Sequence, residues 1–330
     1  MAIATSPALE DEQLAILNGL AREFEEAFQE LSVSAERELS GRTFVFSSYG
    51  RELYPYFEST DADQVPGCII PVKEGRPVAS VDSTCILVGE TAEGALYAAR
   101  TAVGISMEGS LRRFFRLGPI LVYANCSGLS GLIPSVPSSE MDLLMSDHTV
   151  AERFIRNTIE RRVVEALSQS DGDSVIMADG SLKHPLGQLM STVLRRHGRG
   201  RCIVGFSKSS NLIMSEGAVS ALSTARVPSF FPITAGEVTT LLAKFTPDGL
   251  VFRLDLSGPE PPEKILGRII WNDAFASGYP DSLRVAHHLS VFSKAEDQAL
   301  KAFVTKRFRV HQLHTFPLRK IALGGFKGSA

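Results

Sequence analysis

The sequence predicts an α/β protein whose core is a mixed β-sheet flanked by helices, preceded by an N-terminal helix. Between about residues 78 and 122, apolar runs alternate with glycines, a pattern typical of an antiparallel meander. From about residue 150 onward, helical and strand patterns alternate, which indicates strands connected through helices. The composition, 44% hydrophobic and 22% charged, is close to that of globular proteins, so we expect a full core.

The first predicted element is an amphipathic helix over residues 7–40. Ser6 and Pro7 suit a helix start, and acidic residues follow in the first turn. Apolar residues then recur at three- and four-residue steps, at Leu9, Leu14, Leu17, Leu20, Phe24, Phe28 and Leu31. We expect this stripe to pack on the domain or on a second subunit. The chain therefore divides into a helical segment, 1–40, and a domain, 41–330, with its core at about 76–310.

The meander is expected to consist of the runs VASVDST, CILVGE, ALYAARTAVGIS and GPILVYAN. In the first run, Val78, Ser80, Asp82 and Thr84 would point to one face. The elements expected after the meander are a loop at 125–147, a helix at 150–168, a strand at 174–181, a helix at 185–198, a strand at 201–209, a helix at 212–225, a hairpin of 239–245 and 250–256, a strand at 264–273, and two helices in 281–307 that divide near Ser293.

Charge and cysteine usage narrow the possible functions. The net charge is −3, with 34 basic and 37 acidic residues, which excludes a globally polycationic nucleic-acid binder but leaves room for a local basic groove. The four cysteines form no CxxC pair, which argues against a zinc knuckle and for free thiols in a reducing cytoplasm. No signal peptide and no membrane-length apolar run is evident, so we expect a cytoplasmic protein that does not contact a membrane.

Two aspartates occupy positions where a carboxylate needs a partner. Asp82 lies inside a strand pattern, where aspartate is depleted and burial of its charge is costly. Asp179 ends the second strand, before Gly180, and acidic residues at strand ends commonly line ligand sites in α/β sheets. Small residues follow both aspartates and leave room for a metal and a phosphate. The alternative for each residue alone is a carboxylate that caps a turn.

A third carboxylate is needed to hold two divalent ions. The helix before Asp179 offers Glu152, Glu160 and Glu165. Glu160 lies at the margin of the apolar stripe of this helix, Glu152 lies nearer its middle, and Glu165 lies beyond its other side. Periodicity alone does not choose among the three glutamates, and all of them could instead be solvated.

The order of several short motifs resembles that of the NurA family, nucleases that work with the hexameric HerA ATPase in DNA end resection. The motifs are VASVDST, IERRVVEAL, VIMADGSL, VGFSKSS and SGYPDSLRVAHHLSVFS, and they span about residues 76 to 300. The resemblance implies an RNase H-like fold. It also implies metal-dependent DNA cleavage, as an endonuclease on single strands and an exonuclease on ends, usually with manganese, in double-strand-break repair by homologous recombination.

Carried over by position, the resemblance implies metal ligands at Asp82 and Asp179. It favours Glu160 as the third ligand, because the family's glutamate precedes the second aspartate by an interval similar to the one here. It adds His287 as a site residue, although His288 fits the Ala-His motif as well. The family's usual Val-Asp-Gly-Ser is Val-Asp-Ser-Thr in this sequence, so a glycine beside Asp82 is lost.

These groups suit phosphodiester hydrolysis. Two divalent ions ~4 Å apart can activate the attacking water and stabilise the leaving oxygen. Manganese and magnesium prefer carboxylate oxygens, so we expect two Mn²⁺ or Mg²⁺ ions with Asp82 bridging them. A histidine near the site can bind metal or shuttle a proton. Lys208, after the strand RCIVGF, could pair with the scissile phosphate or the acidic cluster, or could be an ordinary exposed lysine.

Basic and aromatic residues provide candidate DNA contacts. The candidates that could position a DNA backbone are Arg112, Arg113, Arg116, Arg195, Arg196, Arg199 and Arg201. Phe114, Phe115 and Tyr279 could stack on unpaired bases. The alternatives are core phenylalanines, a half-buried turn tyrosine, and arginines at a solvated helix end.

No Walker sequence GxxxxGK[ST] is present, so a motor would have to come from another chain, as the resemblance implies with HerA. The resemblance also implies a homodimer docked on the motor's ring. One rival interpretation is an actin-like ATP-binding protein, which shares the RNase H-type core. Another is a non-catalytic DNA-end or motor-binding subunit. A Ser-His-Asp hydrolase is disfavoured, because no GxSxG motif occurs.

Overall fold

The computed structural model describes residues 15–26, 65–129, 144–169, 174–182, 201–207, 221–234 and 238–312, together with positions 29, 40, 43–44 and 141. The centre of the fold is a meander of three long antiparallel strands, β3 (Val78–Thr91), β4 (Gly94–Met107) and β5 (Ser110–Asn125). Two runs that we expected as separate strands, VASVDST and CILVGE, are one strand, β3. Its pairing with β4 shifts register between Leu87 and Gly89.

The chain leaves the meander through the short β6 (Gly128–Leu129) and crosses the sheet in α3 (His148–Gln169). It returns in β7 (Val175–Asp179), which lies parallel to β3, and later in β8 (Cys202–Ser207), which lies parallel to β7. This combination of an antiparallel meander with parallel strands added beside its first strand is the predicted RNase H-like arrangement.

Four further strands extend the sheet beyond β8. They are β11 (Phe252–Ser257), β10 (Thr239–Lys244), β9 (Ser229–Thr234) and β2 (Gly67–Cys68), all in antiparallel pairs. Among the described residues, the complete strand order is β2-β9-β10-β11-β8-β7-β3-β4-β5-β6. The predicted hairpin of 239–245 and 250–256 is confirmed as β10 and β11. Outside this sheet, β1 (Thr43–Phe44) pairs with β14 (His311–Gln312), and β12 (Phe275–Ala276) pairs with β13 (Tyr279–Pro280).

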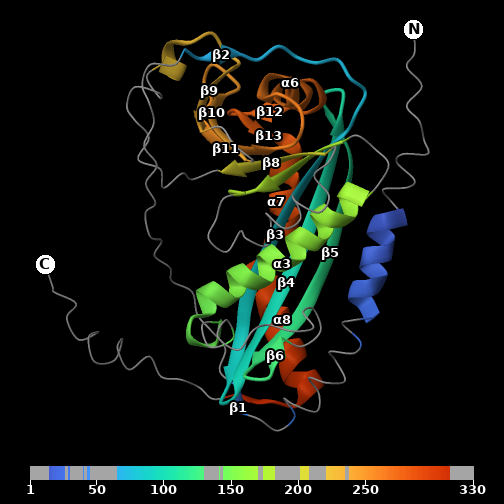
Figure 1. The fold of residues 1–330 in the computed structure, drawn as a ribbon. Helices are drawn as coiled ribbons and strands as arrows, with labels where there is room; N and C mark the ends of the chain where they lie inside the picture. Colours follow the sequence, from blue (N-terminus) through green and yellow to red (C-terminus); the bar gives the residue numbers. More distant parts are fainter. Residues whose placement is uncertain are drawn as a thin grey trace, which may run out of the picture.

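Helices cover both faces of the central strands (Figure 1). On one face, apolar residues of α3 pack against odd-numbered residues of β3 such as Ala79 and Val81. On the other face lie α7 (Asp281–Ser290) and α8 (Lys294–Phe308), which are separated near Ser293 as predicted. Ser293 and Glu296 form a capping box that starts α8. Because side chains alternate along a strand, Ser80 and Asp82 point toward α7.

The N-terminal helix is present over residues 15–26 within the predicted range. Leu17, Leu20 and Phe24 of its apolar stripe are buried in the cluster that contains the α3 residues. The stripe therefore packs on its own chain, which was the first of the two expected partners. The rest of the predicted helix lies outside the described residues or at isolated positions.

The predicted strand at 264–273 is wrong: this segment is α6 (Pro262–Asn272). Pro262 stands in the first turn, where its missing N–H costs nothing. Ile265, Leu266 and Ile269 are fully buried, and their spacing is that of one helix face rather than of a strand. The apolar content of the run ILGRII favours a strand, but the spacing of its apolar residues is helical.

Three strands of the sheet, β2, β6 and β9, were not predicted, and the reason is clearest for β9. This strand contains Pro232, which cannot donate a ladder hydrogen bond and argues against a strand. The structure accommodates Pro232 at a register shift in the β9–β10 pairing, between Thr240 and Leu241. The arginine run of residues 112–116 belongs to β5, not to a helix end.

The predicted helix 185–198 and most of 212–225 lie outside the described residues, as do the central residues of the loop 125–147. None of the described helices combines the length and the apolar character that a membrane span requires. All four cysteines are free; Cys85 and Cys202 are buried, whereas Cys68 and Cys126 are exposed.

Candidate metal centre

Asp82 and Asp179 lie beside one another on the parallel strands β3 and β7. The register pairs Val81 with Ala178, so the two aspartates occupy the next positions of neighbouring strands and the same face of the sheet. At Asp179 β7 ends, whereas β3 continues to Thr91. Gly180 has a φ of +118°, which favours glycine, and turns the chain away from the sheet. Beyond Ala178, β3 therefore continues without β7 as its paired neighbour.

His287 completes this group from α7, the helix toward which Asp82 points. Its Nδ1 atom lies 2.8 Å from Oδ2 of Asp82. Asp82, Asp179 and His287 each offer one potential ligand atom, and these three atoms all lie within 4.8 Å of one another. His288, the other histidine considered from the sequence, is exposed. The structure thus brings together three of the predicted site residues.

Small side chains allow α7 to approach the sheet closely. Its fully buried residues are Ser282, Leu283, Ala286 and Ser290, and three of them, Ser282, Ala286 and Ser290, are small and recur every four residues. On β4, a Cβ atom at Gly104 would lie only 2.6 Å from the carbonyl oxygen of Ser282. A larger residue at Gly104 would push α7, and with it His287, away from Asp82.

Hydrogen bonds stabilise the buried charge of Asp82, which is 4% exposed. The backbone N–H of Ser83 donates to Oδ1 at 2.9 Å, and the hydroxyl of Ser290 donates to Oδ2 at 2.9 Å. Along the same strand face, the hydroxyls of Ser80 and Ser282 are 2.5 Å apart, and Ser282 also donates to Asp273. Burial raises the pKa of Asp273 to about 6, against the opposing effect of the Ser282 hydrogen bonds.

Tyr279 contacts Asp179. Its hydroxyl donates to Oδ1 of Asp179 at 3.2 Å, and its half-buried ring packs against Phe206 and Phe252. Burial and the nearby charges of Asp179 and Asp82 raise the pKa of this hydroxyl, so it remains a donor. The position matches the half-buried turn tyrosine considered from the sequence.

Asp255, a residue that sequence reasoning missed, anchors the loop after Asp179. It is fully buried on β11 and accepts hydrogen bonds from the Ser181 hydroxyl at 2.5 Å and the Leu182 N–H at 3.0 Å. Thr240 and Arg253 also donate to it. The signal was available, because Asp255 stands inside an apolar strand pattern as Asp82 does.

Glu160 lies on α3, at the opposite face of the sheet, and is 5% exposed. It does not belong to the group of ligand atoms within 4.8 Å. Burial raises the pKa of Glu160 to about 8; Arg156 lowers it, the charges of Asp82 and Asp179 raise it further, and a hydrogen bond with Ser83 lowers it. Glu160 is therefore close enough to both aspartates to feel their charge.

The other two glutamates of α3 have different surroundings. Glu152 is buried and accepts a hydrogen bond from the Leu87 N–H at 2.9 Å, at the register shift of β3. Glu165 forms an i,i+4 pair with Arg161 at 3.8 Å. Neither glutamate belongs to the group of three potential ligand residues.

The candidate DNA contacts on β5 lie apart from Asp82, Asp179 and His287. Arg112, Phe114 and Arg116 are exposed on one face of the strand, whereas Arg113 and Phe115 are half-buried on the other. The register aligns Arg116 with Ala102 and Ala102 with Asp82, so Arg116 lies two strands away from Asp82. Arg112 pairs with Glu108 at 3.1 Å, and Arg116 lies 3.8 Å from Glu296. Lys208, Arg195, Arg196 and Arg199 lie outside the described residues, and Arg201 is half-buried before β8.

The donor set fits a hard divalent cation. Two carboxylates and an imidazole are ligands that Mn²⁺ accepts readily, and Mg²⁺ is served by the carboxylates. Burial is the largest cause of the raised pKa of Glu160, and the charges of Asp82 and Asp179 add to it, so this carboxyl favours its protonated form.

No protein-family model and no curated protein matches the chain. Among solved structures, the NurA nuclease from Sulfolobus solfataricus is similar in fold, with a TM-score of 0.50 at 14% sequence identity over 75% of this chain and 88% of that chain. A second NurA structure has a TM-score of 0.42 at 10% identity, over 73% of this chain and 91% of that chain. Endonuclease V from Bacillus subtilis has a TM-score of 0.36 at 12% identity, over 86% and 94%. The chain therefore has the fold of the Sulfolobus solfataricus NurA nuclease, as its sequence motifs led us to expect.

Proposed function

We propose that this protein is a metal-dependent DNA nuclease of the NurA type. It would cleave single strands internally and degrade DNA ends in the cytoplasm, together with a HerA-type hexameric ATPase, during end resection in double-strand-break repair. The observation that carries this proposal is the convergence of Asp82, Asp179 and His287 to within 4.8 Å at the end of β7, in a nuclease-like fold.

Asp82, Asp179 and His287 would hold the metal. Glu160, which the resemblance implies as a further ligand, would act on the metal from the other face of the sheet. Two Mn²⁺ or Mg²⁺ ions would supply activation of the attacking water and stabilisation of the leaving oxygen. Asp82 is held in place by Ser83 and Ser290, so its carboxylate is oriented in advance. His287 keeps Nδ1 toward Asp82, which fixes the plane of its ring. Lys208, which follows β8, would pair with the scissile phosphate.

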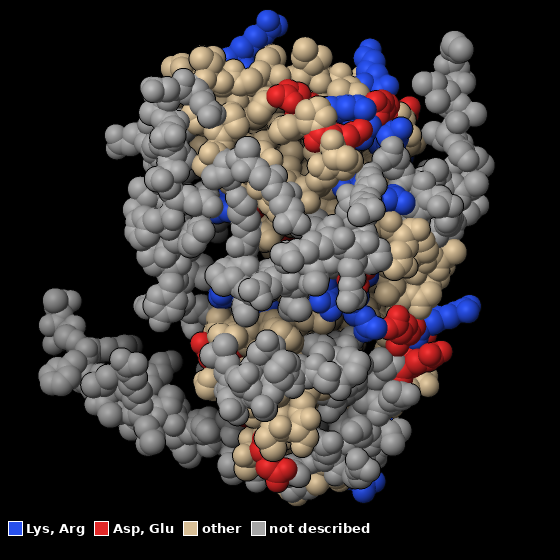
Figure 2. Space-filling view, viewed as in Figure 1, with Lys and Arg blue, Asp and Glu red and all other residues tan. Residues whose placement is uncertain are grey.

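DNA would be held by local basic groups rather than by overall charge. On the face in Figure 2, lysine and arginine lie interspersed with aspartate and glutamate, and the net charge is −3. We propose Arg112, Arg113, Arg116, Arg195 and Arg196 as phosphate contacts, with Phe114 available to stack on an unpaired base because it is 58% exposed. The chain has no Walker motif, which fits a motor supplied by another protein and docked on a homodimer of this chain.

Cleavage of labelled single-stranded DNA tests the function. We expect cleavage with Mn²⁺, none with EDTA, and a loss of at least about 100-fold in Asp82→Asn and Asp179→Asn variants that remain folded. Asp248→Asn, at an exposed turn far along the chain, is the matched control and should keep full activity. Intact DNA under every metal condition would refute the proposal and favour a non-catalytic DNA-end or motor-binding subunit.

A further inference from the structure

We infer that the hydroxyl groups of Ser290 and Tyr279 are positioning groups that each orient one carboxylate of the candidate metal centre. Ser290 acts on Asp82 and Tyr279 acts on Asp179. The inference rests on the proposed function, because it takes both aspartates as metal ligands. Each hydroxyl donates its hydrogen to a carboxylate oxygen, so each acts through its aspartate.

Ser290 and His287 fix one oxygen of Asp82 together. The Ser290 hydroxyl and the His287 Nδ1 lie 2.9 Å and 2.8 Å from Oδ2. Ser290 is fully buried, and its Oγ atom also lies 3.0 Å from the His287 carbonyl and 3.3 Å from the Thr84 hydroxyl. With Ser83 bound to Oδ1, both oxygens of Asp82 have donors, and the carboxylate is held in one rotamer.

Tyr279 plays the corresponding part for Asp179. Its hydroxyl lies 3.2 Å from Oδ1, and its ring is fixed edge-on to Phe206, with 5.1 Å between ring centroids, and against Phe252 at 5.6 Å. Asp179 is the last residue of β7: its pairing with β3 has ended at Ala178, whereas on the β8 side Asp179 still pairs with Phe206. Strand pairing fixes the backbone but not the side-chain rotamer, so a hydroxyl held by aromatic packing restrains the carboxylate of Asp179.

Apart from the Ser83 N–H, these donors come from one stretch of chain. Tyr279 stands in β13, and α7 follows at once with His287 and Ser290. Docking of residues 279–290 on the sheet thus delivers a donor to each aspartate at the same time. Carboxylates that are already oriented lose less freedom when a metal binds, and removal of such supporting hydrogen bonds typically weakens metal affinity 10- to 100-fold.

Mn²⁺ binding without nucleic acid tests the inference, with free Mn²⁺ measured by electron paramagnetic resonance. Ser290→Ala and Tyr279→Phe each remove one hydroxyl and keep the packing. Ser282→Ala is the matched control for the helix, because Ser282 is as buried as Ser290 but bonds to Ser80 and Asp273. Tyr123→Phe is the control for the phenol, since that hydroxyl contacts Thr91.

We expect Ser290→Ala and Tyr279→Phe each to weaken Mn²⁺ affinity by about 10-fold or more, and both controls to stay within about 2-fold of the wild type. In DNA cleavage, the Mn²⁺ concentration for half-maximal rate should rise by the same factor, while the rate at saturating Mn²⁺ recovers. This recovery distinguishes positioning from a general loss of structure.

Two results would overturn the inference while the proposed function stands: wild-type Mn²⁺ affinity in both hydroxyl variants, or an equal loss in Ser282→Ala and Ser290→Ala. A wild-type protein that cleaves no DNA and binds no Mn²⁺ would overturn the proposed function, and the inference with it.

Discussion

At the scale of single residues, the burial of Asp82 is explained by its partners. The aspartate inside a strand pattern is held by a backbone N–H, a serine hydroxyl and a histidine, and it faces a second carboxylate on the next strand. Aspartates that interrupt an apolar strand pattern were informative in this chain: both Asp82 and Asp255 are buried and fully engaged in polar contacts.

The adjacent histidines allow a prediction at this scale. Replacement of His287 by alanine removes the imidazole beside Asp82, whereas replacement of exposed His288 removes a side chain of the same kind one position away. We expect His287→Ala to lower the rate of Mn²⁺-dependent DNA cleavage by about 100-fold or more and His288→Ala to leave it unchanged. Rates at equal protein concentration, with circular dichroism to verify folding, provide the comparison. Equal losses in the two variants would contradict the assignment.

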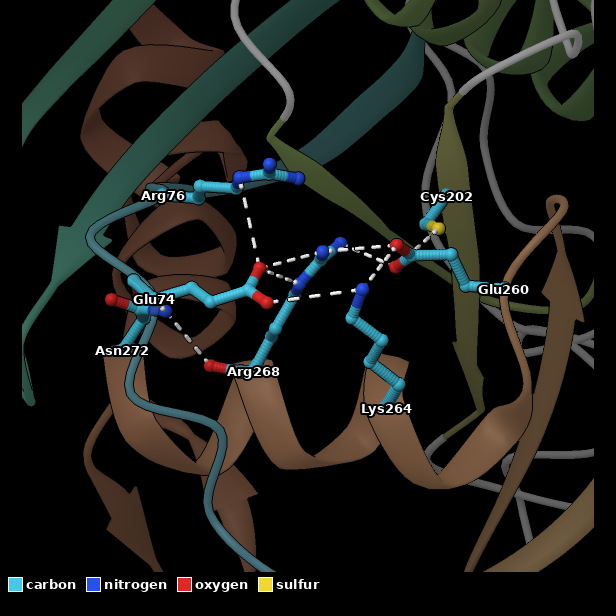
Figure 3. A network of polar contacts seen from close by, with 7 residues as sticks. All are labelled: Glu74, Arg76, Cys202, Glu260, Lys264, Arg268 and Asn272. Carbon is cyan, nitrogen blue, oxygen red and sulfur yellow. Dashed lines mark hydrogen bonds and ion pairs between the residues drawn. The ribbon is translucent and has the colours of Figure 1, made fainter.

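At the scale of elements, α6 is held by a cluster of ions around one buried arginine (Figure 3). Arg268 is 1% exposed, and its guanidinium contacts Glu74 at 2.6 Å and Glu260 at 3.0 Å. Partial burial alone would raise the pKa of Glu260, but the hydrogen bond from Lys264 and the charge of Arg268 lower it overall. The cluster fastens the segment before β3 to α6, where the Val72 N–H also donates to the carbonyl of Gly267.

This cluster gives a prediction on stability. Arg268→Met removes the buried cation and leaves two carboxylates facing each other, so we expect the free energy of unfolding to fall by about 3 kcal/mol. Lys264→Met is the matched control: Lys264 touches the same two glutamates from the same helix but is 41% exposed, and its loss should cost about 0.5 kcal/mol. Urea unfolding at pH 7 measures both values. A loss of stability in Lys264→Met as large as that in Arg268→Met would show that burial of the cation is unimportant.

At the scale of the whole molecule, ten of the described strands form one sheet, whose middle carries the candidate metal centre. Arg112 and Arg116 of β5 lie two strands away from it, on an exposed strand face that also carries Phe114. A net charge of −3 gives no general attraction for DNA, so binding has to depend on such local groups.

The salt dependence of DNA binding tests this view. For single-stranded DNA with EDTA present, we expect the logarithm of the binding constant to fall linearly with the logarithm of salt concentration. Replacement of Arg112 and Arg116 by alanine should make the slope shallower by about 1.4, or about 0.7 for each lost phosphate contact. Lys306→Ala with Arg307→Ala, two exposed positions on α8, is the matched control. Identical slopes in the wild type and the Arg112/Arg116 variant would exclude β5 from the DNA contact.

Local patterns predicted most of the longer described elements, but they missed β9 and the two-residue strands and indicated a strand where α6 lies. The alternation in β3, the stripe in α3 and the capping serine before α8 each reflect interactions within a few residues. The apolar content of the run ILGRII predicts a strand, although the spacing of its buried residues is helical. Pro232 argues against a strand, so β9 was not predicted. The register shift that accommodates this proline depends on the neighbouring strand β10, which the local sequence does not show.

By itself, the sequence determined the alternation of strands and helices and the face of the strand on which Asp82 lies. It also indicated which carboxylates need a partner. These features follow from periodicity and from the cost of burying charge, which are local properties. Only the tertiary structure decided that Asp82 and Asp179 share a face of adjacent strands, that His287 rather than His288 reaches them, and that Ser290, Tyr279 and Asp255 support the centre. Strand register and helix docking join residues up to about 200 positions apart, and no local pattern encodes such a distance.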